Sequence, residues 1–178
     1  ENELVRAAII HSQFESIHPF DDGNGRVGRL LIGLYLFNCG VIKTPIFYIS
    51  EAINQEKSVY YAMLTDSRIN NYDEWIKFFL RKCIIQADIH YKYITSFDRL
   101  HDEVDKSLKN KFNSSKTERI VEALFKQPLL TSNFLSEYVG ISQSQANKYL
   151  LAMESMGIIQ GDDKKRYRKY SFGALIDL

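Results

Sequence analysis

The spacing of apolar residues predicts a mainly helical chain. Apolar positions recur every three or four residues, the period of an α-helix that buries one face. The expected helices cover residues 3–16, 24–37, 50–69 (with a break near Gln55) and 73–108, with an extended segment over residues 44–49. The helix over 73–108 is too long to be covered by one domain, so we expect its second half to bridge to the next.

The C-terminal part follows a different pattern. Helices are expected over residues 117–125, 133–139 and 142–156, and the last two are separated by a turn at Gly140. Two helices joined by a glycine-containing turn have the spacing of a helix-turn-helix. Residues 158–172 then alternate like a β-hairpin. The pattern predicts a small winged helix-turn-helix domain with a β-hairpin wing.

A polar segment without apolar periodicity separates these two parts. We therefore expect a first domain over residues 1–110, a linker over 111–116 and a second domain over 117–178. The chain opens on a helix already in progress, which is typical of the C-terminal part of a longer protein, with the N-terminal part of the first domain missing.

Composition narrows the class of protein. The 178 residues are 45% hydrophobic and 25% charged with a net charge of +1, so no overall field attracts nucleic acid or membranes. The longest apolar run, residues 30–37, is too short to cross a bilayer. Cys39 and Cys83 lie in apolar helical surroundings and are expected to be buried thiols. We expect a soluble cytoplasmic protein with no membrane partner.

The chemically informative segment runs from His18 to Arg29. Gly23 and Gly25 flank Asn24 where a helix begins, so several backbone N–H groups can point at one spot. Such an arrangement at the positive end of a helix binds anions and is suited to phosphate.

Four side chains of the same segment add to this chemistry. Arg26 and Arg29 are three residues apart, hence on one helix face, and can bind further phosphate oxygens. Asp22 would be repelled by phosphates unless a divalent cation such as Mg²⁺ lies between them. His18 is the one group here that accepts a proton near neutral pH. Together they describe attack by a hydroxyl on a nucleotide phosphate.

The segment His-x-Phe-x-Asp-Gly-Asn-Gly-Arg-x-x-Arg resembles the signature of the Fic/DOC family, and the resemblance extends over about residues 2–110. It implies a Fic-type helical core and transfer of AMP from ATP to a Ser, Thr or Tyr hydroxyl of a target protein. His18 would be the catalytic base and Asp22 would hold Mg²⁺. The remaining nucleotide-binding positions would be Gly23, Asn24, Gly25, Arg26 and Arg29, the last at the γ-phosphate.

The resemblance implies two softer assignments, one for Phe20 and one for a pair of tyrosines. Phe20 would point inward as a core anchor of the loop. Tyr60 and Tyr61 would border the adenine, with simple core packing as the open alternative. His11, one helix back from the loop, is expected to serve packing or a structural hydrogen bond.

The second domain leaves another function open. Residues that would contact DNA on its recognition helix and wing are Gln143, Asn147, Lys148, Lys164, Lys165, Arg166 and Arg168. Residues 116–178 carry 9 Lys or Arg and 7 Asp or Glu, a net charge of only +2, which is low for a DNA-binding domain. The alternative function is a DNA-binding regulator in which the Fic core is a nucleotide sensor or self-modifying module. Docking or homodimerisation through the winged helix stays open as well.

Overall fold

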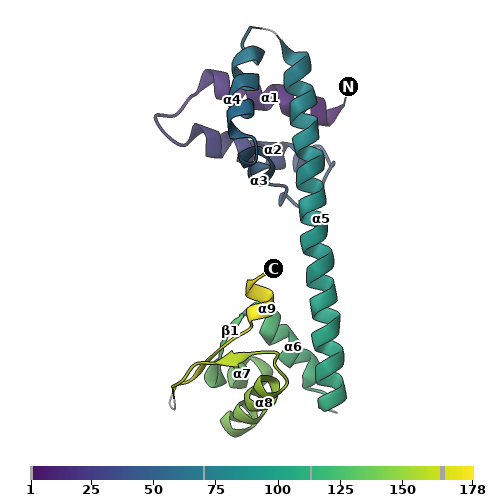
Figure 1. Ribbon diagram of the computed structural model, residues 1–178, viewed down its shortest axis with the longest axis vertical. Coiled ribbons are helices and arrows are strands. Elements are labelled where there is room, and N and C mark those ends of the chain that lie inside the picture. Colours follow the sequence, from purple (N-terminus) through teal and green to yellow (C-terminus); the bar gives the residue numbers. More distant parts are fainter. Residues whose placement is uncertain (1, 70, 113, 165–166) are drawn as a thin grey trace. The chain divides into compact units, whose positions relative to one another are not determined.

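The computed structural model describes residues 2–69, 71–112, 114–164 and 167–178. Over these residues the chain is mainly helical and carries one small sheet of three short strands (Figure 1). It forms two compact units, residues 1–91 and 92–178. The helix α5 (Tyr72–Lys111) belongs to both units, because the division between residues 91 and 92 falls within it.

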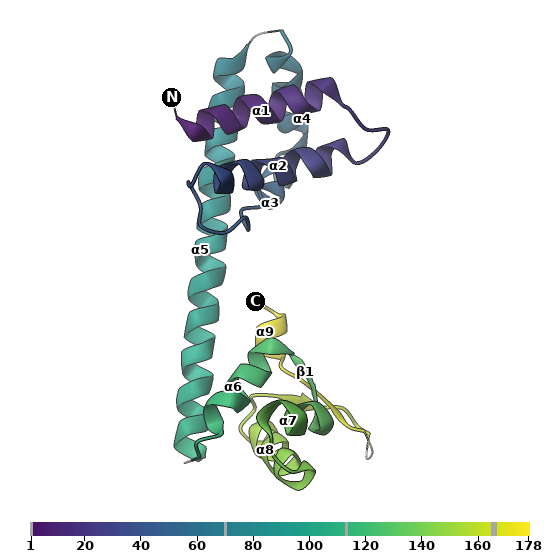
Figure 2. The same ribbon diagram turned by 180° about the vertical axis from the view of Figure 1, so that it is seen from behind.

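The first unit is built from helices alone. Its helices α1 (Glu3–Ile17) and α2 (Asn24–Asn38) lie side by side (Figures 1 and 2). They are followed by α3 (Ser50–Asn54) and α4 (Lys57–Ser67), and then by the first part of α5. The expected helices are therefore confirmed, including the break near Gln55, which lies between α3 and α4.

Aromatic residues of α5 form the centre of this unit. Trp75, Phe78 and Phe79 are each 1% exposed and pack with apolar residues of α1, α2 and α4. The Trp75 indole Nε1–H donates a hydrogen bond to the carbonyl oxygen of Ala8 at 2.8 Å. This buried bond connects α5 to α1, the helix that leads into the candidate loop.

Two sequence-based expectations for this unit are wrong. Residues 44–49 do not form a strand: residues 44 and 45 are bends, residues 46–48 are irregular, and Ile49 has helical angles (φ −75°, ψ −2°) because it directly precedes α3. Cys39 is exposed, since it caps the end of α2, whereas Cys83 is buried as expected. Burial raises the pKa of the Cys83 thiol to about 12.

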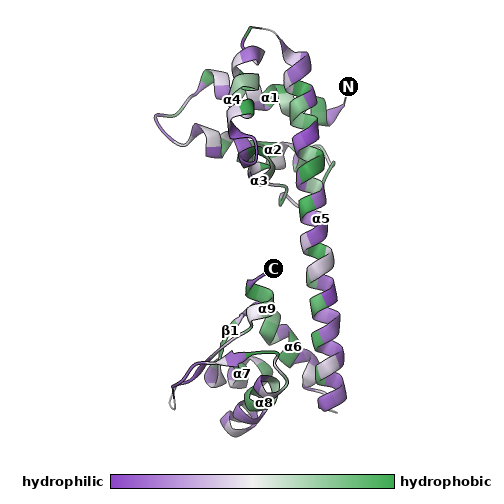
Figure 3. Cartoon of the chain, in the orientation of Figure 1, coloured by the Kyte–Doolittle hydropathy of each residue, from purple (hydrophilic) through white to green (hydrophobic). Residues whose placement is uncertain are grey.

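The second unit surrounds a core of its own. Its helices are α6 (Thr117–Lys126), α7 (Ser132–Val139), α8 (Gln143–Ser155) and the short α9 (Gly173–Ile176). Leucines from α6, α7 and α8 are fully buried there, with the second part of α5 packed against them. The last turns of α5 are mostly hydrophilic, as Figure 3 shows.

The turn between α7 and α8 is fixed by local signals. Thr131 accepts a hydrogen bond from the backbone N–H of Phe134 and so caps α7. Gly140 ends α7 with a left-handed backbone (φ 72°), and Ser142 and Gln145 form a capping box at the start of α8. The expected helix–turn–helix order is therefore observed.

The sheet has one strand more than the sequence predicted. β3 (Lys169–Ser171) pairs antiparallel with β2 (Gln160–Gly161) on one side and with β1 (Leu129–Thr131) on the other. Tyr170 is the central position, opposite Leu130 and Gly161. The sequence analysis expected only the β2–β3 hairpin, because β1 is too short to show an alternating pattern.

Candidate active-site loop

The loop between α1 and α2 is bounded by two residues with left-handed backbones. His18 (φ 51°, ψ 59°) ends α1, and its backbone N–H donates to the carbonyl oxygen of Phe14 at 3.0 Å. Gly23 (φ 82°) precedes the first residue of α2. A left-handed conformation is unfavourable for a side chain such as that of His18, and such strain is concentrated at functional sites. The His18 side chain is exposed.

Asn24 holds the loop through the backbone of Phe20. Its side chain is buried, its Oδ1 accepts from the Phe20 N–H at 2.9 Å, and its Nδ2 donates to the Phe20 carbonyl oxygen at 2.5 Å. Phe20 itself is 50% exposed, with its ring centre 6.3 Å from that of Phe14. The expectation that Phe20 is an inward core anchor is therefore wrong. The amide of Asn24 performs the anchoring, through polar contacts that an apolar pattern cannot show.

The start of α2 leaves backbone donors open. The N–H groups of Arg26 and Val27 both donate to the carbonyl oxygen of Gly23 at 3.0 Å. Those of Asn24 and Gly25 have no partner within the part of the chain that the structure describes, as is usual for the first turn of a helix. These two donors lie where the sequence predicts an anion-binding backbone.

Two arginines lie against the glycines at this helix start. A Cβ atom placed on Gly23 would lie 3.3 Å from a terminal nitrogen of Arg26, and one on Gly25 would lie 3.1 Å from Nη1 of Arg29. Both guanidinium groups therefore extend along the first turn of α2. The half-buried Arg29 also donates from Nε to Ser50 Oγ at 2.7 Å.

Asp22 is the acidic residue of the loop. Its side chain is 95% exposed, and it lies 3.4 Å from the guanidinium of Arg26. Its Oδ1 accepts from the backbone N–H of Gly23 at 2.6 Å. Over the described ranges, the chain has no group of three or more His, Cys, Asp or Glu side chains that could hold a metal ion.

A buried polar layer lies beneath the loop. The Nε2 of His11 is 2.9 Å from the hydroxyl of Tyr60, and both residues are buried, as expected for a structural His11. Burial lowers the pKa of His11 to about 4. Glu15 is also buried, which raises its pKa, and its Oε1 has no hydrogen-bond partner in the described structure. Gly28 allows α2 to approach, since a Cβ there would lie 2.3 Å from this oxygen.

The two tyrosines assigned to the adenine differ in exposure. Tyr60 is 2% exposed, and this burial is the main reason why its pKa is raised. Tyr61 is 54% exposed, with its ring centre 5.3 Å from that of Tyr60. The position of Tyr60 fits the alternative of core packing, whereas Tyr61 is available at the surface.

Two further residues beside Arg29 were not identified from the sequence. In the sequence, Ser50 is only the first residue of the helix expected over residues 50–69, and no pattern singles out Tyr48. Tyr48 is 45% exposed, and hydrogen bonding to Ser50, followed by interactions with Arg29, lowers its pKa. Ser50 and Arg29 are 21 residues apart in the sequence, and no local pattern predicts the hydrogen bond between them.

In the second unit, several of the residues predicted to contact DNA are exposed. Gln143, Asn147, Lys148 and Lys164 are exposed, and Gln143 donates to the side chain of Asn133 at 2.9 Å. Lys165 and Arg166 lie outside the described residues.

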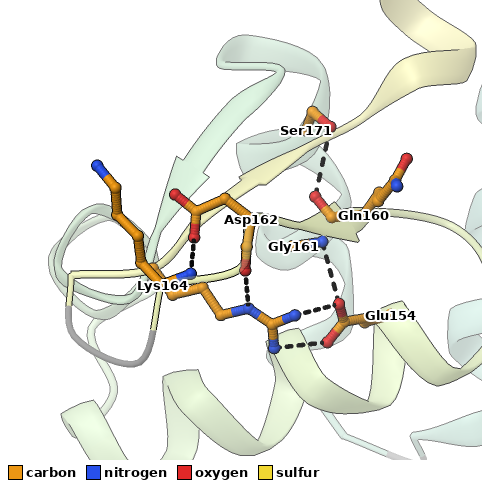
Figure 4. A network of polar contacts seen from close by, with 7 residues as sticks. Glu154, Gln160, Gly161, Asp162, Lys164 and Ser171 are labelled. Carbon is orange, nitrogen blue, oxygen red and sulfur yellow. Dashed lines mark hydrogen bonds and ion pairs between the residues drawn. The ribbon is translucent and has the colours of Figure 1, made fainter.

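Arg168 is engaged within the unit. Its guanidinium donates to both carboxylate oxygens of Glu154, at 3.0 and 2.7 Å. Figure 4 shows Glu154 within this network of polar contacts. Its Nε–H donates to the carbonyl oxygen of Asp162 at 2.8 Å. Its donors are therefore used to hold the β2–β3 connection on α8.

None of the described helices is long and apolar enough to cross a membrane.

Comparisons with known proteins find similar sequences for the first part of the chain. Residues 1–36 match the model of the Fic/DOC family. A probable protein adenylyltransferase of Aquifex aeolicus is 32% identical over 42% of this chain and 31% of the relative. A protein adenylyltransferase of Caenorhabditis elegans is 28% identical over 65% of this chain and 21% of the relative. A Fido domain-containing protein of Dictyostelium discoideum is 58% identical over 20% of this chain and 24% of the relative.

The matches thus span less than a third of the length of these curated relatives. The matched residues include the whole loop from His18 to Arg29 with the two helices that carry it. Through this segment, the first part of the chain is similar to the Fic/DOC family.

Proposed function

We propose that this chain supplies the phosphate-binding loop and the catalytic base of a protein adenylyltransferase, which transfers AMP from ATP to a Ser, Thr or Tyr hydroxyl of a target protein. The observation that carries the proposal is the pair of guanidinium groups, from Arg26 and Arg29, that lie against Gly23 and Gly25 beside open backbone donors. A set of donors with two positive charges at a helix start suits a polyphosphate. Relatives named protein adenylyltransferase support the same activity.

Each part of the loop takes one part of the nucleotide. The backbone N–H groups at Gly23, Asn24 and Gly25 would receive the α- and β-phosphates, with Arg26 beside them. Arg29 would receive the γ-phosphate. Because the side chain of Asn24 is occupied by the backbone of Phe20, Asn24 contributes through its N–H alone. Tyr61 would border the adenine, and Tyr60 would support it from the core.

The chemistry of Asp22 fits Mg²⁺. A single exposed carboxylate is how this ion is usually held next to phosphates, because phosphate oxygens and water supply its other ligands. When bound, Mg²⁺ would neutralise charge on the phosphates and on the leaving pyrophosphate. Asp22 now lies 3.4 Å from the guanidinium of Arg26. On binding Mg²⁺, Asp22 would give up this ion pair, and Arg26 could then contact the nucleotide.

His18 would act as the general base. Its imidazole would take the proton of the target hydroxyl while that oxygen forms a bond to the α-phosphorus and the bond to pyrophosphate breaks. The left-handed backbone of His18 turns the chain out of α1 and leaves the side chain at the surface, where a target side chain can reach it. The buried carboxyl group of Glu15, three residues before His18, interacts with it electrostatically.

We further propose that the second unit is a winged helix, with α7 and α8 as its helix-turn-helix and β2–β3 as its wing. A DNA-binding regulator is the second candidate function, and the exposed Gln143, Asn147 and Lys148 on one side of α8 favour it. The pairing of Arg168 with Glu154 weakens the case for the wing, because that guanidinium already has a partner.

The test is transfer of label from ATP labelled at the α-phosphate to proteins of a cell lysate. We expect labelled protein bands with the unaltered chain and Mg²⁺, and label on the chain itself would indicate self-modification. His18→Ala should lower transfer by about 10²–10⁴-fold, the usual contribution of a general base, and leave ATP affinity nearly unchanged. His101→Ala is the matched control, since this histidine is on α5 in the other unit. Transfer by His18→Ala above a tenth of the unaltered level would refute the role of His18.

A further inference from the structure

The side chain of Arg29 is fixed by a residue from another part of the chain. Its Nε–H donates to Ser50 Oγ at 2.7 Å, while its Nη1 lies against Gly25. Arginine has many rotamers, and a long side chain that must be immobilised by its ligand weakens binding. The contact with Ser50 uses the donor at the base of the guanidinium. The two terminal nitrogens remain directed along the start of α2.

Gly33 explains how Ser50 reaches Arg29. The two α2 residues Arg29 and Gly33 are four apart, so they share one face of the helix. A Cβ atom on Gly33 would lie 2.7 Å from the carbonyl oxygen of Phe47, so only glycine lets this backbone pass so close to α2. The segment that follows Phe47 therefore runs beside that face and brings Ser50 to Arg29. Tyr48 lies on the same stretch, and its hydroxyl also interacts with Ser50 and Arg29.

The same segment is held from the other side by α5. The buried side chain of Gln86 accepts, at its Oε1, a hydrogen bond from the backbone N–H of Ala52 at 3.0 Å, near the start of α3. Gln86 also contacts His90 at 3.0 Å, and the His90 ring packs edge-on against Phe47. These contacts fix the position of Ser50 without using its hydroxyl. Removal of that hydroxyl should therefore leave the segment in place.

We infer that Ser50 is a positioning residue for Arg29 and that, through Arg29, it sets the preference of this site for a nucleoside triphosphate over a diphosphate. The inference rests on the proposed function, because it assigns Arg29 to the terminal phosphate. With Nε engaged, the guanidinium presents its two Nη groups as a fixed fork, which matches two oxygens of one phosphate. A diphosphate does not reach this fork and should be insensitive to it.

Calorimetric titration of the full chain with ATP and with ADP, each with Mg²⁺, tests this inference. Ser50→Ala should weaken ATP binding about fivefold, the cost of holding one flexible side chain, and change ADP binding less than twofold. Ser50→Thr keeps the hydroxyl and should bind ATP like the unaltered chain. Ser16→Ala is the matched control, because it removes a hydroxyl that bonds only to the Ser12 carbonyl oxygen of its own helix.

A second variant and a second readout separate positioning from folding. Ser50→Cys keeps the size of the side chain but offers a weaker acceptor, and its ATP affinity should fall between those of the alanine variant and the unaltered chain. In NMR spectra without nucleotide, the Arg29 Nε–H should exchange with water faster in Ser50→Ala than in the unaltered chain. A merely structural serine would lower the melting temperature without this change at Arg29.

The outcomes distinguish this inference from the proposed function. Equal losses for ATP and ADP, or no loss for either, in a chain that otherwise prefers ATP would overturn the role of Ser50 and leave the proposed function standing. If the unaltered chain bound neither nucleotide, the proposed function and the γ-phosphate role would both fail. A fivefold loss confined to ATP, rescued by Ser50→Thr, would support the inference.

Discussion

The replacement Asn24→Ala should destabilise the first unit and disorganise its loop. Asn24 is 2% exposed, and its amide makes two hydrogen bonds to one backbone unit, with the N–H of Phe20 at 2.9 Å and with its carbonyl oxygen at 2.5 Å. Alanine would leave both Phe20 groups without these partners. The loop between His18 and Gly23 would then lose the two hydrogen bonds that hold its middle.

The size of this effect follows from the two contacts. A hydrogen bond within a protein contributes about 1 kcal/mol to stability, so the two should contribute about 2 kcal/mol. In a unit of this length, a loss of that size lowers the melting temperature by roughly 10 °C. Asn24→Asp is the informative companion: it keeps the shape and the acceptor for the Phe20 N–H but turns the Nδ2 donor into an oxygen that faces a carbonyl. We expect it to be no more stable than the alanine variant.

The assay is urea unfolding followed by tryptophan fluorescence. Trp75 is the single tryptophan of the chain and is buried in the first unit, so its emission reports on that unit. Asn54→Ala, at an exposed position at the end of α3, serves as the control and should change the free energy of unfolding little. A loss below about 0.5 kcal/mol for Asn24→Ala, or full stability in Asn24→Asp, would show that the amide does not hold the loop.

Two further predictions concern a buried histidine and an ion pair. The free energy of unfolding of the first unit should fall as the pH drops from about 6.5 toward 4. In the unfolded chain His11 binds a proton near the ordinary histidine pKa, whereas in the folded chain burial lowers its pKa to about 4. His11→Gln should flatten this slope in urea unfolding at pH 7 and pH 4.5, and an unchanged slope would assign it to other groups. Arg168→Ala should modestly lower the melting temperature of the second unit, because it removes the two hydrogen bonds to Glu154. Circular dichroism melting with Lys164→Ala as control measures this, and equal melting temperatures for the two variants would contradict it.

The fold could be predicted from sequence wherever the signal is local. The helices of the first unit follow from apolar spacing, and the turn between α7 and α8 follows from Gly140 and the capping residue Ser142. β1 was missed because its three residues become a strand only by pairing with β3, about forty positions later. The exposed Cys39 was missed for a related reason: apolar neighbours in sequence do not decide which face of a helix end is covered.

In the candidate site, too, the sequence predicts what is local and misses contacts between distant residues. The residues from His18 to Arg29 are contiguous, so the sequence displays their chemistry directly. It does not display contacts made across the fold, such as the bond between Arg29 and Ser50 or the pairing of Arg168 with Glu154. The resemblance implies a core position for Phe20, but the buried position in the loop belongs to Asn24. Its two hydrogen bonds satisfy polar groups that an aromatic ring could not.

This arrangement separates the residues that hold the loop from those that act. Asn24 is buried and holds the backbone of Phe20, whereas His18, Asp22 and Arg26 are exposed at the surface. The side chain that holds this loop is only four residues from Phe20, which is why the sequence of one short segment can specify it. Arg29 is the exception: it is half-buried, one turn further along α2, and it depends on Ser50 to hold its side chain. Variation around Ser50 should therefore alter nucleotide preference while the signature itself is unchanged.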